Sequence, residues 1–124
     1  YWYNIVFPVF DGKIYLSYKN IDHNLDIYID DSRKLVYKHS IKADAIEEHL
    51  IHNDKNDVYG ILYDLKGNAA SSVQFFVTDS TRHFLRGSLY FNAQPNHDSL
   101  APVIQFVRKD IEHIINTLSW KNTN

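Results

Sequence analysis

The chain has 124 residues and a formal net charge of −2; hydrophobic residues make up 44% of it, and cysteine is absent. This composition is typical of a folded protein with one core, so we expect a single globular domain over residues 1–124. The lack of a basic surplus argues against nucleic acid as a partner, and no apolar run approaches the ~20 residues of a membrane-spanning helix. Without cysteine, these residues provide no disulfide scaffold, thiolate zinc site or cysteine nucleophile.

The first predicted element is a β-hairpin. Residues Tyr3–Phe10 are apolar and β-forming, and Ile14–Tyr18 alternate between apolar and polar positions. Asp11-Gly12 lies between the two segments, and this pair tolerates the positive φ of a tight two-residue turn. Pro8 removes one backbone donor, which favours an edge strand for the first segment.

A helix is predicted next, over Leu25–His39, because the apolar positions change to helical spacing. Asn24 or Asp22 would cap its N-terminus. The following residues, 41–52, suit either a continuation of the helix or a strand. We favour a strand around Ile46–Ile51.

Three further strands are predicted at Val58–Leu65, Ser72–Thr78 and His83–Asn92. The turns between them, Lys66-Gly67-Asn68 and Asp79–Arg82, are too short for parallel crossovers, so the strands should form an antiparallel meander. In the second strand Val73, Phe75 and Val77 should share one face of the sheet.

The last predicted element is the helix Ser99–Leu118, in which apolar residues form a continuous stripe. Asp98 or Ser99 would cap it and Pro102 would fall in its first turn. The predicted fold class is therefore α+β, with a mainly antiparallel sheet of five to six strands and two helices packed on it.

Histidines and carboxylates suggest a metal site only weakly. Glu48, His49 and His52 could ligate zinc if this segment were helical. On a strand the two histidines point to opposite faces and cannot share an ion. We therefore expect no metal and no cofactor, and a metal-dependent enzyme stays as an alternative function.

Asp79, Ser80 and His83 include the three residue types of a serine-hydrolase triad within five positions. Known triads draw their members from separate elements, so their closeness in sequence argues against catalysis. Asp79 is better explained as a turn residue that accepts backbone N–H groups. We expect no catalytic residue, and a serine hydrolase remains the second enzymatic alternative.

The segment 78–87 concentrates two arginines, a histidine, an aspartate and three hydroxyl groups around one turn and the start of a strand. Such side chains form charge-assisted hydrogen bonds, and arginine is frequent among interface hot spots. The hypothesis is a partner-binding surface formed by Asp79, Ser80, Thr81, Arg82, His83 and Arg86. If Arg86 pairs inside the protein, only the turn remains a candidate, and the simplest alternative is an exposed hairpin tip.

Several stretches, in order along most of the chain, resemble the gliding motility lipoproteins of GldD type from Bacteroidetes. The most specific blocks are Thr78–Phe91 and Asp98–Ile104. The other matching pieces are Ile14–Lys19, Leu35–His39, Ile41–Ile46 and Gln74–Val77.

The resemblance implies a periplasm-facing lipoprotein of the cell envelope, whose lipidated N-terminal Cys precedes these residues and is its contact with the membrane. It also implies a non-enzymatic role in gliding motility and type IX protein secretion, with proteins of that apparatus as partners. The order of elements is similar to the Mog1/PsbP-like α/β/α sandwich, a fold used mostly by binding and assembly modules. A third function class, a small-ligand-binding module, would need a pocket of several hundred Å³ between sheet and helix.

Overall fold

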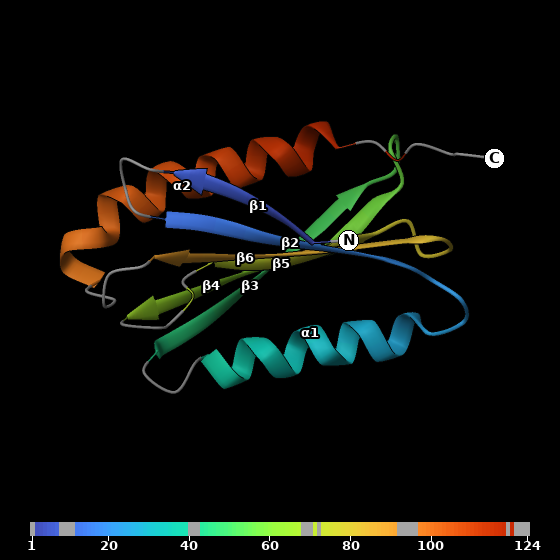
Figure 1. Ribbon diagram of the computed structural model, residues 1–124, viewed down its shortest axis with the longest axis horizontal. Helices are drawn as coiled ribbons and strands as arrows, with labels where there is room; N and C mark the ends of the chain where they lie inside the picture. Colours follow the sequence, from blue (N-terminus) through green and yellow to red (C-terminus); the bar gives the residue numbers. More distant parts are fainter. Residues whose placement is uncertain are drawn as a thin grey trace.

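The computed structural model describes residues 2–7, 12–39, 43–67, 71, 73–91, 97–118 and 120. Two helices and six strands lie within these ranges (Figure 1). In chain order they are β1 (Trp2–Phe7), β2 (Gly12–Asn20), α1 (Leu25–His39), β3 (Ala43–Asn53), β4 (Val58–Gly67), β5 (Val73–Thr78), β6 (His83–Phe91) and α2 (His97–Thr117).

The strands form one six-stranded sheet in the order β1-β2-β6-β5-β4-β3, and every pairing is antiparallel. The predicted α+β class, hairpin and meander are thereby confirmed. The pairing of β2 with β6 joins the hairpin to the meander, with Ser17 opposite Arg86 and Tyr18 opposite Leu85. Pro8 and Asp11 lie outside the described residues.

Helix α1 has the predicted bounds, and Asn24 occupies the N-cap position. The Asn24 carbonyl accepts hydrogen bonds from the backbone N–H groups of Ile27 and Tyr28, at 3.1 and 3.3 Å. Strand β3 extends beyond the predicted Ile46–Ile51, which excludes the helical alternative for residues 43–53. The long ladder with β4 explains this length, because it runs from Ala43–Gly67 to Asn53–Val58 with one irregularity.

Helix α2 starts two residues earlier than predicted, so Asp98 and Ser99 lie inside it and do not cap it. Pro102 consequently lies in the second turn, and the prediction that it falls in the first turn was wrong. A proline there removes the bond that the Asp98 carbonyl would otherwise accept, although its fixed φ suits a helix. Burial of the following turns through Val107, Ile111 and Ile115 offsets the loss.

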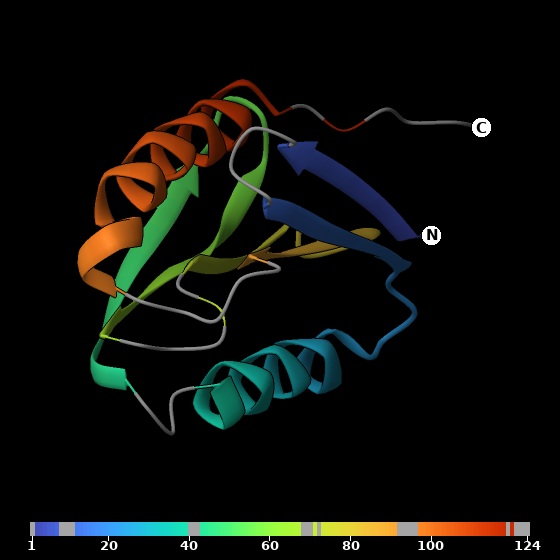
Figure 2. The same cartoon turned by 60° about the vertical axis from the view of Figure 1, so that its left-hand side comes forward.

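The helices cover opposite faces of the sheet, α1 on one side and α2 on the other, which gives three layers (Figure 2). Strand β5 shows the division most clearly, because all six of its residues are buried. As predicted, Val73, Phe75 and Val77 share one face, and they join the α2 core. Phe76 belongs to the core under α1.

Each face has its own hydrophobic core. The buried members of the α2 core are Ile14, Val58, Leu62, Val73, Phe75, Val77, Leu89, Val107, Ile111 and Ile115. The buried members of the α1 core are Val36, Tyr63, Leu65, Phe76 and Phe84.

Candidate functional site

The turn between β5 and β6 is organised by Asp79. One carboxylate oxygen, Oδ1, accepts the backbone N–H groups of Thr81, Arg82 and His83 at 3.1, 2.8 and 2.9 Å. Burial of the carboxyl would raise the pKa of Asp79, but these three N–H groups and the charge of His83 outweigh burial and hold it below its usual range. Asp79 therefore fixes the turn with its own carboxylate.

Thr78 completes the turn from the other side. Its hydroxyl accepts the Ser80 N–H at 2.9 Å and donates to the His83 carbonyl at 2.6 Å. Ser80 has a φ of 72°, a left-handed conformation that these bonds sustain. The side chains of Ser80, Thr81 and Arg82 are exposed on this fixed backbone.

A groove of about 480 Å³ lies beside the turn. It separates the turn from the loop that leads into α1, and its lining residues are Ile21, Asp22, His23, Leu25, Asp26, Ser80 and Thr81. The Ile21 N–H donates to the Arg82 carbonyl at 2.8 Å, which ties the loop to the turn. Turn and loop thus form one surface at this end of the sheet, with acidic side chains facing hydroxyl groups across the groove.

His83 lies half-buried under the neighbouring aromatic residues. Its Nδ1 contacts the Tyr18 hydroxyl, and its ring stacks on Trp120 with centroids 5.1 Å apart and an interplanar angle of 5°. Its Nε2 is 3.8 Å from Asp79 Oδ2, beyond hydrogen-bond distance. Ser80 is not the partner of either ring nitrogen, so the three residue types are not arranged as a hydrolase triad.

Trp120 connects this surface to the next hairpin tip. Its indole N–H donates to the Asp57 carbonyl at 2.9 Å, while its ring covers His83. Asp57 belongs to the β3–β4 turn and has a φ of 54°. The two tips and Trp120 therefore stand together at one end of the sheet.

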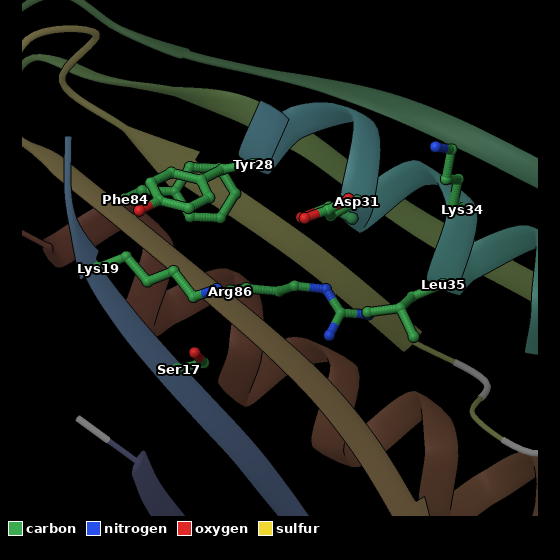
Figure 3. Close-up of a pocket in the computed structure, with 9 residues that line it drawn as sticks. Ser17, Lys19, Tyr28, Asp31, Lys34, Leu35, Phe84 and Arg86 are labelled. Carbon is green, nitrogen blue, oxygen red and sulfur yellow. The ribbon is translucent and has the colours of Figure 1, made fainter. Parts of the chain in front are cut away.

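Arg86 does not belong to this surface. It lies on the α1 face of β6, opposite Phe76 and Ser17 in the sheet register, and it donates from Nη2 to Gln74 Oε1 at 2.8 Å. Figure 3 shows its side chain running along the sheet beneath α1, with Asp31 and Leu35 facing it from the helix. The six predicted residues are thus divided between two places, with the turn and His83 in one and Arg86 in the other.

The metal-site alternative is also changed by the register. His49 pairs opposite Leu62 on the α2 face, whereas His52 lies opposite Tyr59 on the other face, so these two histidines cannot share an ion. His49 instead meets Glu47 and Asp64, whose candidate ligand atoms lie within 4.8 Å of one another.

Arg108 from α2 already forms an ion pair with Asp64, the buried carboxylate of that group. Its Nε donates to both oxygens of Asp64 at 2.8 and 2.9 Å, and its Nη2 lies 2.8 Å from Oδ2. The charge of Asp64 is therefore compensated within the chain. His49, 2.9 Å from Asp64 Oδ2, completes a network that joins α2 to the sheet.

Comparison with known proteins decides the family. A family model described as "Gliding motility lipoprotein GldD" matches residues 1–120. The chain belongs to the GldD family. Neither the curated proteins nor the solved structures include a match.

Membership of the GldD family makes the chain a gliding motility lipoprotein, a membrane-anchored component of the gliding machinery. The family is not known as a family of enzymes. Neither α1 nor α2, the helices in the described part of the chain, is long and apolar enough to cross a membrane.

Sequence reasoning missed the residues of the GldD-family chain that support the turn. Tyr18 lies on β2, Ile21 follows that strand and Trp120 lies beyond α2, so all three contact the turn from distant parts of the sequence. The one available signal was an isolated tryptophan after an amphipathic helix, since tryptophan combines a large ring with one N–H donor. Its partner could not be chosen without the register of the sheet.

Proposed function

We propose that the domain is a non-enzymatic accessory component that binds protein partners of the gliding machinery and of the associated type IX protein secretion system. It would face the periplasm, held at the cell envelope by its lipid anchor. The family match supports the system, and the fixed turn beside the groove supports the mode of action.

The exposed side chains of Ser80, Thr81 and Arg82 carry the proposed contact. Asp79 and Thr78 hold their backbone with five hydrogen bonds, so a partner would order little of the chain on binding. Arg82 forms no side-chain hydrogen bond or ion pair with the described residues and is thus available for a partner carboxylate.

Asp79 and His83 support this surface in a different way. The carboxylate of Asp79 is directed at backbone N–H groups, and His83 is covered by Trp120 and touches Tyr18. Both residues shape the surface, but their carboxylate and imidazole groups are engaged within the chain and are not presented to a substrate. This arrangement favours binding over hydrolysis. The three-layer order supports the Mog1/PsbP-like sandwich as the fold type, itself a scaffold for binding modules.

The first test replaces Arg82 by Ala in the lipoprotein and follows gliding and secretion in cells where the variant is the only copy. We expect loss of gliding or secretion with a change in stability within about 0.5 kcal/mol, because Arg82 is exposed. Lys55→Ala is the matched control, an exposed cation on the neighbouring hairpin tip.

Normal gliding and secretion with Arg82→Ala would refute the proposed surface. An equal defect in Lys55→Ala would also refute it, because loss of any cation at this end of the sheet would then produce the effect. Thermal unfolding of both purified variants identifies a defect that merely follows instability.

A further inference from the structure

The cavity between α1 and the sheet contains a cation whose charge is not compensated within the described chain. The cavity measures about 310 Å³, and its lining residues are Ser17, Lys19, Tyr28, Asp31, Ser32, Lys34, Leu35, Phe84 and Arg86. Arg86 donates to the neutral amide of Gln74 and forms no ion pair with a carboxylate of the described residues. Arg108, the corresponding arginine of the α2 face, pairs with both Asp64 and Glu112.

Two residues that line the cavity each have a buried polar atom without a hydrogen-bond partner among the described residues. One is Nε of Arg86, and the other is the hydroxyl oxygen of Ser32, a residue with only 2% of its surface exposed. An unsatisfied buried polar atom typically costs ~1–3 kcal/mol, and such atoms are rare in folded proteins. An oxygen-bearing group bound against these two residues would offer an acceptor to each of these donors.

The other residues that line the cavity determine what kind of ligand body it can hold. The rings of Tyr28 and Phe84 lie side by side with centroids 5.4 Å apart, and Leu35 adds an aliphatic wall (Figure 3). The ammonium group of Lys19, an exposed residue, lies 4.9 Å from the Tyr28 ring centroid. The pocket therefore offers a cationic end and an apolar side, as small-molecule sites commonly do.

We propose that this cavity is a binding site for a small organic carboxylate with an apolar body, whose charged end is held by Arg86 and Ser32. A carboxylate fits better than a phosphate dianion, because Lys34 is paired with Asp30 and Asp31 adds a negative charge at the rim. Guanidinium and carboxylate match in a planar, two-bond geometry. This site is independent of the turn surface, so its failure would leave the proposed function standing.

The experiment titrates the ¹⁵N-labelled chain with 3-phenylpropionate and follows amide shifts by NMR. We expect saturable shifts around Ser32 and Arg86 with a dissociation constant of about 1 mM or below. The neutral analogue 3-phenylpropionamide should bind at least ~10-fold more weakly, because it lacks the charge that Arg86 recognises.

Variants test the assigned contacts. Arg86→Gln should weaken binding ~10-fold or more, and Ser32→Ala ~3-fold. Asp31→Asn should strengthen it ~2-fold by removing a repulsive charge, and this variant keeps the test valid if Arg86→Gln does not fold. Arg33→Gln, an exposed arginine of the same helix that lies over Tyr37, is the matched control and should bind as the native chain does.

A peptide with a free C-terminal Phe, compared with its amidated form, identifies the source of the carboxylate. Binding of 3-phenylpropionate alone indicates a free small acid, and binding of the peptide acid as well indicates a chain terminus; both support the site. The absence of saturable shifts up to about 10 mM of either acid would overturn the proposal. Equal affinity for acid and amide, or affinity unchanged in both Arg86→Gln and Asp31→Asn, would overturn it too.

Discussion

Asp64 is a buried carboxylate that pairs with side chains from two other elements. Its side chain is only 6% exposed on the sheet, and it receives Arg108 from α2 on both oxygens and His49 from β3 on one. Burial lowers the pKa of Arg108, but the hydrogen bond and charge of Asp64 outweigh burial and raise it. One residue thus holds a helix, an edge strand and an inner strand together.

Asp64→Asn should lower the free energy of unfolding by about 2–3 kcal/mol, because the change leaves Arg108 without its main counter-charge. The control is Glu112→Gln, which removes the other, half-exposed partner of Arg108 and should cost at most about 0.5 kcal/mol. Urea unfolding followed by tryptophan fluorescence measures both. Similar decreases in the free energy of unfolding in the two variants would show that the burial of Asp64 does not strengthen its ion pair with Arg108.

At the scale of elements, the β5–β6 turn depends on the ionised form of Asp79. Its pKa is below the unfolded value of about 3.9, so the turn contributes stability above that pH. This contribution is lost as the pH falls through the folded pKa, where the carboxylate takes up a proton. The turn is thus an acid-sensitive element within the sheet.

Asp79→Ala should cost about 1–2 kcal/mol at pH 7, and Asp79→Asn less, because the amide oxygen can still accept N–H groups. Both variants should lose less stability than the native chain between pH 4 and the folded pKa, since neither has the titrating group. Urea midpoints measured from pH 7 down to strongly acidic pH provide the comparison. Parallel pH profiles for native chain and Asp79→Asn would contradict the assignment.

At the scale of the whole molecule, one sheet serves two cores, so both should be lost in a single unfolding transition. Val36 belongs to the core under α1 and Ile111 to the core under α2, on opposite faces. Val36→Ala should cost about 2 kcal/mol and Ile111→Val about 1 kcal/mol, through lost burial and the space left behind. The double variant should lose the sum, because the sites share no partner.

Circular dichroism and tryptophan fluorescence should give coincident unfolding curves for all three variants. Separate transitions, or a double variant far from additive, would show that the layers unfold as distinct units.

The whole fold also shows which elements could be predicted from the sequence and which could not. The bounds of α1 follow from neighbouring residues, because Asn24 lies at the cap and the apolar period begins at Leu25. The meander follows from connections too short for any other pairing. The start of α2 was misplaced because Pro102 is a common first-turn residue, and packing further along decided the extent of the helix.

The candidate sites were only partly predictable, because they depend on contacts between distant elements. Local composition predicted the Asp79–Arg82 turn, and the structure adds its fixed geometry. Its role as a partner-binding surface stays a prediction. Arg86 was assigned to the same surface because it is close in sequence. Alternation along β6 and the position of α1 place it in a separate cavity, which neither composition nor spacing could show.

The order of the sheet leaves its two rims chemically unequal. In the described sheet, β1 and β3 each pair on one side only. Strand β3 carries Glu47, Glu48 and His49 along its length, whereas the six residues of β1, WYNIVF, include no charged residue. Charged side chains on an edge strand disfavour the addition of another strand, so β3 carries in its own sequence a protection against intermolecular pairing that the sequence of β1 lacks.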